Sequence, residues 1–475
     1  MQLSSIKEGV ITQMNTIAPK RNTWIKRNKY YYKNLVKFLK FNIPENSRIL
    51  EIGCGTGYLL NELKPSYGVG IDISPEMIHI AKEQFPQYDF QVMDAEQITL
   101  KEKFDFIIIS DSIGYFEDVQ KAFSQLHSVC NKDTRIIITY INFIWLPLLS
   151  LAQWLGLKMP QKRSNWLEIE DISNLLKLTD FDIIKHGRRF LLPINIPIIS
   201  WLCNNYLVHL PFFNLFGLKK FIIARSIAEY NQNPQQKSIS VIIPARNEKG
   251  NIEAALQRMP QMGSHTEVIF VEGNSTDDTL EEIKRVCAAY SSLLDVKYTT
   301  QDGKGKGDAV RKGFAMASGD ILVILDADLT VPPEDLPKFY NAIASGKGEY
   351  INGSRLVYPM EDEAMRTLNI MGNKFFSIMF SWLLNQRLKD TLCGTKVISQ
   401  ANYQKLIANR SYFGDFDPFG DFDLIFGSSK LNLKIVEIPI RYKARSYGET
   451  NISRFKHGWL LLKMVAFAMN KIKFI

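Results

Sequence analysis

The stretch Gly319–Thr330, GDILVILDADLT, decides how the second half of this chain folds. Its apolar run Ile321–Leu325 is short and rich in isoleucine, leucine and valine, which is typical of a buried strand. Asp326 and Asp328 follow it, at the carboxyl end of the strand, where open α/β sheets bind ligands. Two carboxylates there can hold a hard divalent cation that bridges a diphosphate. An acidic loop that merely ends a strand has the same local pattern, so the neighbouring sequence has to decide.

Three earlier strands are predicted in this half, and each also ends in polar residues. The strands are Ser238–Ile243, Glu267–Val271 and Val296–Thr300, and the loops after them are Pro244–Glu248, Glu272–Asp278 and Asp302–Gly307. The last loop opens a helix with glycines and lysines, a combination that suits an anion. Because the carboxyl ends of parallel strands meet at one edge of a sheet, we expect these loops to line a single crevice.

The ordered set of motifs resembles the family-2 glycosyltransferases of GT-A fold, and within them the dolichyl-phosphate mannosyltransferase and polyprenyl-phosphate glycosyltransferase branch. The resemblance spans Ser238–Ile475. It is carried by PARNE (Pro244–Glu248), VEGNSTDDT (Val271–Thr279), GKGDAVRKG (Gly305–Gly313), DADLT (Asp326–Thr330), GSR (Gly353–Arg355), KDTLCGTKV (Lys389–Val397) and RSYGETNIS (Arg445–Ser453).

The resemblance implies roles for individual residues. The predicted nucleotide contacts are Pro244, Arg246, Glu248 and Glu272, and the predicted ligands of Mg²⁺ or Mn²⁺ are Asp326 and Asp328, which also count as catalytic residues. The predicted phosphate contacts are Lys306, Arg355, Lys396 and Arg445. The catalytic residues predicted around the sugar or acceptor are Asp390, Asp421 and Asp423. Two positions depart from the family pattern, Glu272-Gly273-Asn274 in place of Asp-Asp-Gly and Lys396 in place of Arg. No QxxRW-like stretch of the processive synthases is present, which favours a single transfer.

The implied chemistry is attack of an acceptor oxygen on the anomeric carbon of a nucleotide-sugar while the metal takes up charge on the leaving diphosphate. A phosphate acceptor is already anionic and needs little help. An alcohol needs a general base, and Gly414–Asp423 offers carboxylates for that case. The same cluster can also be a solvated acidic turn.

In the first half, a predicted strand runs into the glycines of Glu51–Gly57 (EIGCGTG), and later strands end at Asp72 and before Asp94-Ala95. This pattern resembles the class I S-adenosylmethionine-dependent methyltransferases over Lys33–Ile141. It implies cofactor-binding residues Glu51, Gly53, Gly55, Gly57, Asp72, Asp94 and Ala95, with Asp72 on the ribose and Asp94 beside the adenine. A non-catalytic Rossmann domain is the alternative. The sequence does not identify the methyl acceptor or its base; His127 is expected to pack on a helix, and the role of His186 stays open.

The chain of 475 residues is long enough for at least two domains. We expect an α/β protein of two Rossmann-like doubly wound domains, a class I methyltransferase fold and then a GT-A fold, with an amphipathic C-terminal helix. The predicted boundaries are a methyltransferase domain at 1–230, a polar linker at 231–237 and a glycosyltransferase domain at 238–475. In the first half, strands that alternate with helical segments imply a doubly wound parallel sheet.

Several features predict contact with a membrane. The net charge of +9 suits phosphorylated substrates or anionic lipid, and no nucleic-acid motif is present. Ile136–Leu157 and Phe190–Leu218 carry no charged residue but contain proline and asparagine, so we expect buried or interfacial hairpins. Met365–Trp382 has apolar residues at helical spacing, which is more typical of core packing, and Trp459–Ile475 reads as a basic amphipathic helix for an anionic surface. Five scattered cysteines and the lack of a signal peptide predict a cytoplasmic protein on the cytoplasmic face of a membrane.

The sequence therefore predicts a bifunctional transferase. Its sugar would pass from a nucleotide-sugar to a polyprenyl-phosphate-type lipid, and its methyl group from S-adenosylmethionine to an unidentified glycan or lipid acceptor. Two alternatives remain: sugar transfer to a glycan hydroxyl in polysaccharide synthesis, or one domain acting as a non-catalytic nucleotide-binding module that recruits the other to a membrane.

Overall fold

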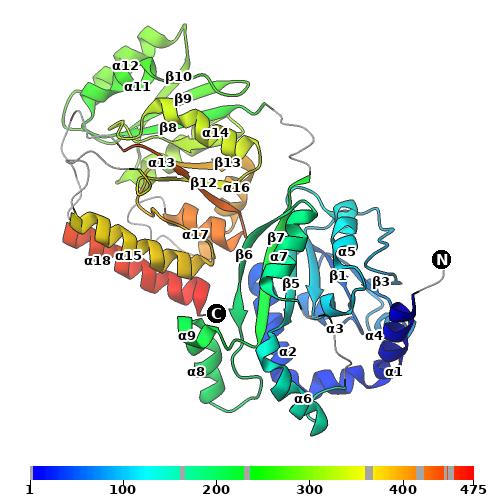
Figure 1. The fold of residues 1–475 in the computed structure, drawn as a ribbon. Helices are drawn as coiled ribbons and strands as arrows, with labels where there is room; N and C mark the ends of the chain where they lie inside the picture. Colours follow the sequence, from blue (N-terminus) through cyan, green and yellow to red (C-terminus); the bar gives the residue numbers. More distant parts are fainter. Residues whose placement is uncertain are drawn as a thin grey trace. The chain divides into compact units, whose positions relative to one another are not determined.

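The computed structural model describes residues 4–160, 165, 167–228, 236–358, 367–412, 422–442, 447 and 454–474, with side chains for all of these except 367–371 and 454–457. The chain divides into two compact units, Met1–Gln232 with Phe474–Ile475, and Asn233–Lys473. Figure 1 shows a strand-and-helix layer structure in each unit. Most of the predicted linker, residues 231–235, lies outside the described residues.

The first unit is built on a seven-stranded sheet in the order β3-β2-β1-β4-β5-β7-β6. Its strands are β1 (Arg48–Ile52), β2 (Tyr67–Asp72), β3 (Asp89–Val92), β4 (Phe106–Ser110), β5 (Arg135–Ile141), β6 (Phe181–Arg189) and β7 (Lys219–Ser226). The helices are α1 (Ser5–Arg27), α2 (Lys29–Asn42), α3 (Tyr58–Leu63), α4 (Pro75–Gln84), α5 (Val119–Leu126), α6 (Leu146–Trp154), α7 (Ile169–Leu178), α8 (Ile199–Asn205) and α9 (Pro211–Asn214).

A hydrophobic cluster covers each face of this sheet. Successive side chains of a strand point to opposite sides, so each strand contributes to both clusters. Along β1, Leu50 and Ile52 belong to one hydrophobic cluster and Ile49 to the other. The five strands β1 to β5 are parallel, as predicted. The expectation of a wholly parallel sheet was wrong at one edge, where β7 runs antiparallel to both β5 and β6.

The second unit also has a seven-stranded sheet, in the order β10-β9-β8-β11-β13-β12-β14. Its strands are β8 (Ile239–Ala245), β9 (Thr266–Glu272), β10 (Asp295–Thr300), β11 (Ile321–Ile324), β12 (Tyr350–Ser354), β13 (Lys396–Ser399) and β14 (Ile435–Pro439). The helices are α11 (Ile252–Gln257), α12 (Thr279–Tyr290), α13 (Lys306–Met316), α14 (Leu336–Ala344), α15 (Thr367–Leu384), α16 (Gln400–Ala408), α17 (Phe422–Lys430) and α18 (Arg454–Ala468), followed by a π-helical turn, Met469–Lys473.

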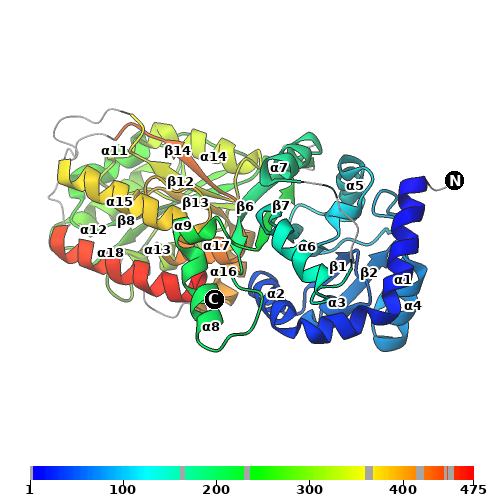
Figure 2. The ribbon, with the colours of Figure 1, turned by 60° about the horizontal axis from the view of Figure 1, so that its bottom comes forward.

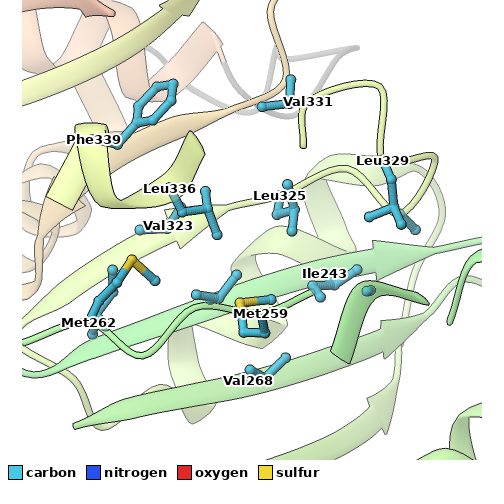
Figure 3. Close-up of a cluster of buried hydrophobic side chains, with 14 of the residues drawn as sticks. Ile243, Met259, Met262, Val268, Val323, Leu325, Leu329, Val331, Leu336 and Phe339 are labelled. Atoms are coloured by element: carbon cyan, nitrogen blue, oxygen red, sulfur yellow. The ribbon is translucent and has the colours of Figure 1, made fainter. Parts of the chain in front are cut away.

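The strand predicted at Ile321–Leu325 lies in the middle of this sheet, beside β8 in parallel and β13 in antiparallel register. This sheet is mixed, since β13 runs antiparallel to both of its neighbours, β11 and β12. Figure 3 shows Val323 and Leu325 packed with residues of β8 and β9, Ile243 and Val268, on one face of the sheet. This packing fixes the strand end that carries Asp326.

Of the two uncharged stretches of the first unit, the first begins in β5, as predicted, and both are mostly helical beyond that strand. After β5 the chain forms a 3₁₀ turn and α6, and the later stretch forms α8, a 3₁₀ turn and α9 before it enters β7. Figures 1 and 2 show α6 and α8 outside the sheet. Many of their apolar side chains are exposed, for example Trp154 of α6 at 81% and Trp201 of α8 at 54%. No described helix is both long and apolar enough to cross a bilayer.

In the second unit, α15 packs largely into the core, which is the more typical role of its apolar spacing, and the C-terminal helix differs from its prediction. Phe376, Phe380 and Leu383 of α15 are core residues. Of the predicted apolar positions, Met379 and Trp382 pack against the same cluster, and Phe375 is 50% exposed. The last predicted helix is interrupted by the π-helical turn after Ala468. Lys473, expected at a membrane surface, is instead buried and donates hydrogen bonds to the carbonyl of Trp382 and to Asn385.

Candidate active sites

A glycine-rich turn follows β1 of the first unit. Gly53, Gly55 and Gly57 have φ angles of 74°, 53° and 77°, a region that favours glycine. The Asp72 carboxylate at the end of β2 accepts hydrogen bonds from the amides of Gly55 and Ser74, both at 2.9 Å. Burial raises the pKa of Asp72, although these amides act against it. Asp72 therefore holds the turn in place and keeps lone pairs for a further donor.

Glu51 lies under this turn in a pocket of about 380 Å³ that also contains Gly53, Thr56 and Asp111. Its Oε2 atom is buried and has no hydrogen-bond partner among the described residues. Burial raises the pKa of Glu51 to about 8. A buried acceptor without a partner is costly, so this pocket suits a ligand that brings a hydrogen-bond donor or a positive charge.

The predicted adenine-side residues are covered by α1, which the sequence did not place. Lys7 of α1 contacts the carboxylates of Asp94 at 2.6 Å and Glu96 at 2.7 Å. Further along α1, Asn15 accepts a hydrogen bond from Ser74 at 2.6 Å. Ala95 is buried in the hydrophobic cluster beside β1. The polar residues of α1 at Lys7, Asn15 and Asn22 were the available signal, but their partners are distant in sequence.

A second missed group lies at the end of β4. Asp111 has a φ of 59°, and its Oδ2 atom accepts a hydrogen bond from the Tyr31 hydroxyl at 2.8 Å and contacts Lys219. Arg21 lines the same pocket. A non-glycine residue in the left-handed region is uncommon and often marks a functional position. His127, by contrast, stacks on Phe181 and is a packing residue, as expected.

In the second unit, the loops that follow β11, β12 and β10 bring charged residues together. Lys306 lies 2.5 Å from Asp326. Burial acts to raise the pKa of Asp326, but Lys306, Lys396 and Arg355 outweigh it, and the pKa is lowered. Four of the predicted residues thus share one site.

Gly394 closes this site from behind. A Cβ atom on Gly394 would lie 1.8 Å from Oδ2 of Asp326, so a side chain cannot be accommodated at this position without movement. Lys396 is buried at 1% exposure and donates a hydrogen bond to the carbonyl of Cys393. The KDTLCGTKV segment therefore contributes both its backbone, at Gly394, and its lysine to the surroundings of Asp326.

Arg355 and Asp390 form a bidentate ion pair. The Arg355 Nε and a terminal nitrogen donate to the two Asp390 oxygens at 2.7 and 2.8 Å, and the Arg355 amide donates at 3.0 Å. Burial acts to raise the pKa of Asp390, yet Arg355 lowers it. Because Asp390 is fully buried, its contacts position Arg355 and leave no oxygen exposed. A direct catalytic role for Asp390 stays a prediction.

Asp328, the second carboxylate of the Asp-x-Asp motif, is partly buried. Its Oδ1 atom accepts hydrogen bonds from the Thr330 amide at 3.1 Å and from the Thr330 hydroxyl at 2.8 Å. Among the described residues no three His, Cys, Asp or Glu side chains group as a metal site. Asp326 and Asp328 offer the hard oxygens that Mg²⁺ and Mn²⁺ prefer, and would need further ligands such as diphosphate oxygens and water. The residues present fit such an ion.

The predicted nucleotide loops are held to each other. The Asn247 carboxamide oxygen accepts from the Thr276 amide at 2.8 Å, and the Asn247 amide donates to the Ser275 hydroxyl at 3.1 Å. Glu272 accepts from the Ser275 amide at 2.6 Å, and Glu248 accepts from Asn251 at 2.7 Å. Both glutamates are therefore buried supports of these loops, whereas Arg246 is exposed and Pro244 partly buried.

Three predicted site residues lie elsewhere or cannot be placed. Asp423 lies in the first turn of α17 and pairs with Arg410 at 3.0 Å. Asp421 and Arg445 lie outside the described residues, as does most of Gly414–Asp423. Of the RSYGETNIS motif, Tyr447 is described, and its ring packs directly against Gly250, beside the PARNE loop. That contact brings one part of the last motif to the nucleotide loops.

Comparison with known proteins finds a different family in each half of the chain. Residues 24–186 match the family described as methyltransferase domain, and residues 240–407 match glycosyl transferase family 2. A dolichol-phosphate mannosyltransferase of Pyrococcus furiosus is 40% identical over 25% of this chain and 33% of its own length. A low-salt glycan biosynthesis hexosyltransferase of Haloferax volcanii is 29% identical over 47% of this chain and 51% of its own.

The chain thus spans about a third to a half of the length of these curated relatives. Among solved structures, a possible histamine N-methyltransferase of Thermotoga maritima, described as dependent on S-adenosylmethionine, is 18% identical. It covers 45% of this chain and 98% of its own, with a TM-score of 0.37.

Proposed function

We propose that this chain, which joins a methyltransferase domain to a family 2 glycosyl transferase domain, is a bifunctional enzyme that transfers a sugar to a polyprenyl-phosphate-type lipid and a methyl group to a second acceptor. The proposed domains are 1–230 and 238–475, with 231–237 as the linker. Relatives named as dolichol-phosphate mannosyltransferases support the lipid acceptor.

The observation that carries sugar transfer is the meeting of Asp326 with Lys306, Lys396 and Arg355 from separate loops. A nucleotide-sugar presents a diphosphate, which cations stabilise as it leaves. A Mg²⁺ or Mn²⁺ ion held by Asp326 and Asp328 would supply further positive charge there. The acceptor oxygen forms a bond to the anomeric carbon, and the bond to the nucleotide diphosphate breaks with its electron pair.

The described carboxylates favour an acceptor that is already anionic. A hydroxyl acceptor needs a general base close to the reacting oxygen. Asp390 is buried behind Arg355, and Asp423 pairs with Arg410. A phosphate acceptor needs no proton removed, and Arg355 and Lys396 would attract it. Transfer to a glycan hydroxyl is the second candidate, favoured by the relative named for glycan biosynthesis.

For the first domain we propose S-adenosylmethionine as the methyl donor. The glycine turn, Asp72 and the Glu51 Oε2 atom without a partner support this assignment. Glu51 would accept from the amino group of the ligand, Asp72 would contact its ribose, and Asp94, now paired with Lys7, would lie beside the adenine.

We also propose that the protein binds the cytoplasmic face of a membrane peripherally. The exposed apolar side chains of α6 and α8, and Trp459 and Leu462 of α18, support such contact. Flotation with anionic liposomes tests it: the protein should float with the lipid, and substitution of Trp154 and Trp201 by Ser should leave more of it in solution.

Sugar transfer is tested with radiolabelled nucleotide-sugars and membranes. Label should enter an acid-labile lipid fraction, and Asp328→Asn should abolish this incorporation, while Asp295→Asn, at the opposite end of a strand, should leave it unchanged. Label in a glycan instead of lipid supports the second candidate. Nucleotide binding without transfer of any label would contradict both and make the domain a binding module.

A further inference from the structure

A pocket of the first unit lies beside the proposed methyl-donor site and has no role in the function proposed so far. It encloses about 570 Å³, including its open mouth. Four of its lining residues are cations, Lys37, Arg189, Lys219 and Lys220, and no carboxylate is among the described residues that line it. We call this site the cation pocket.

The antiparallel edge of the sheet explains why these cations meet. Arg189 ends β6 and Lys219 begins β7, and the two residues are paired across the strands. Lys220 follows Lys219, and Lys37 reaches the same pocket from α2. Tyr31, Phe38, Phe190 and Phe221 supply aromatic walls. A short piece of local structure therefore concentrates positive charge in an aromatic pocket.

Two of the four cations are paired with acids outside the lining, and Arg189 lies close enough to Lys37 to disfavour its charged form. Lys219 and Lys220 are buried, and their partners are Asp111 and Glu168. Burial, then Arg189 and Lys33, lowers the pKa of Lys37, and burial lowers the pKa of Arg189 to about 10. Cations whose charged form is disfavoured in this way gain from a bound anion.

The cation pocket and the donor pocket share a wall. Leu35 lines both pockets, and Tyr31 and Lys219, which line the cation pocket, both contact Asp111, which lines the donor pocket. A ligand in the cation pocket is thus one side chain away from the site proposed for the methyl donor. An acceptor anchored there would have to extend past this wall and bring its reacting atom to within about 3.5 Å of the methyl carbon.

We propose that the cation pocket binds a phosphate group of the methyl acceptor. The proposal rests on the methyl-transfer function proposed above. A lone pair of the acceptor forms a bond to the methyl carbon, the carbon–sulfur bond breaks, and its electron pair stays on sulfur. A proton on the attacking atom passes to water. The lysines and arginine hold the phosphate and do not enter the bond changes.

The surroundings favour a lipid-linked phosphate over a soluble one. Phe190 and Asn204 line the pocket and belong to the uncharged stretch that forms α8 and α9. This stretch continues as exposed apolar side chains, including Trp201 at 54% and Phe212 at 66%. An acyl or prenyl chain attached to the bound phosphate would find apolar surface directly outside the pocket.

Photolabelling of the full chain tests the proposal. The probe is a farnesyl phosphate with a benzophenone at its far end, added with saturating S-adenosylhomocysteine, and labelled peptides are identified by mass spectrometry. Label should appear in residues 190–216. Lys37→Gln and Arg189→Gln should each reduce it about tenfold. Lys40→Gln removes another exposed lysine of α2 that does not line the pocket, and should leave the label unchanged.

Competition identifies the source of the phosphate. Protection by farnesyl phosphate alone supports a lipid-linked acceptor, and equal protection by sn-glycerol 3-phosphate supports the phosphate site with a soluble ligand. Equal labelling by the farnesol analogue, or unchanged labelling of folded Lys37→Gln and Arg189→Gln proteins, would overturn the proposal. Calorimetry with S-adenosylhomocysteine tests the donor site separately. Absence of binding would reject the donor assignment, and the photolabelling results would still test the cation pocket.

Discussion

At the scale of single residues, Gly394 limits where the Asp326 carboxylate can lie. A methyl group added there would lie only 1.8 Å from Oδ2 of Asp326, which is closer than two nonbonded atoms can approach. Gly394→Ala should therefore displace Asp326 and lower sugar transfer by roughly tenfold to a hundredfold, because small displacements of reacting groups are costly. The measurement is the initial rate of lipid labelling. Gly372→Ala is the matched control, since its added Cβ meets nothing within 4 Å; equal losses in both variants would contradict the prediction.

Glu51 gives a prediction about pH. Its pKa is raised from 4.5 to about 8 by burial, so the folded state holds the proton more tightly than the unfolded chain does. The stability that this proton contributes is full below pH 4.5 and is lost as the pH rises to about 8. Glu51→Gln should therefore gain stability relative to wild type between these values, by on the order of a few kcal/mol at pH 8.

The measurement for Glu51→Gln is the denaturant midpoint of the first unit at pH 5 and pH 8. The gap between variant and wild type should be wider at pH 8. Glu45→Gln, at an exposed position, should show the same small gap at both values. A gap for Glu51→Gln that does not change with pH would mean that this carboxyl is ionised in the folded protein.

Single residues also show how far sequence reasoning reaches. The glycines after β1 and the acids after β2 and β11 were predicted in their places, because each role depends on a local backbone turn next to a strand end. Asp390 and Asp423 were predicted from position in a motif, but the sequence does not show that arginines occupy their carboxylates. Asp111 and Lys219 were missed, because their contact joins segments that are more than 100 residues apart.

At the scale of elements, the parallel part of each sheet was predictable and the antiparallel edge was not. Alternation of strands and helices implies parallel strands, but a strand inserted in the opposite direction, such as β7 or β13, has the same apolar composition. For Phe190–Leu218 the sequence left a buried and an interfacial position open. An uncharged, apolar run fits burial, and the sequence does not distinguish this from the exposed helices α8 and α9.

Helix α1 is the element whose role is most open to test. Lys7 joins it to Asp94 and Glu96 at 2.6 and 2.7 Å, and the Lys7 side chain is only 11% exposed. Removing one partner of a largely buried ion pair is strongly destabilising locally. Lys7→Met should therefore increase hydrogen exchange in the first turns of α1 and weaken S-adenosylhomocysteine binding by about tenfold or more.

The control for Lys7→Met is Lys26→Met, which changes an exposed lysine in the last turn of the same helix and should leave exchange and affinity unchanged. Tighter binding by Lys7→Met would show that Lys7 competes with the ligand for Asp94. Equal behaviour of the two variants would mean that the amino end of α1 does not cover the donor site.

At the scale of the whole molecule, the two units have separate cores and separate sites. Each core closes around its own sheet, so each unit is expected to unfold in its own transition. A ligand stabilises only the state it binds, by about 2.7 kcal/mol at a hundred times its Kd, which is a shift of a few degrees for domains of this size. Calorimetry should then show two transitions, one raised by S-adenosylhomocysteine and the other by a nucleoside diphosphate with Mn²⁺.

Variants assign these transitions to the units. Asp328→Asn should remove the shift caused by Mn²⁺ with UDP or GDP and keep the shift caused by S-adenosylhomocysteine, because Asp328 belongs to the second unit alone. Asp72→Asn should do the reverse, since Asp72 holds the glycine turn of the first unit at 2.9 Å. The contrary result would be a single transition whose temperature both ligands raise, with either variant removing both shifts. It would show that the two domains fold and bind as one cooperative body.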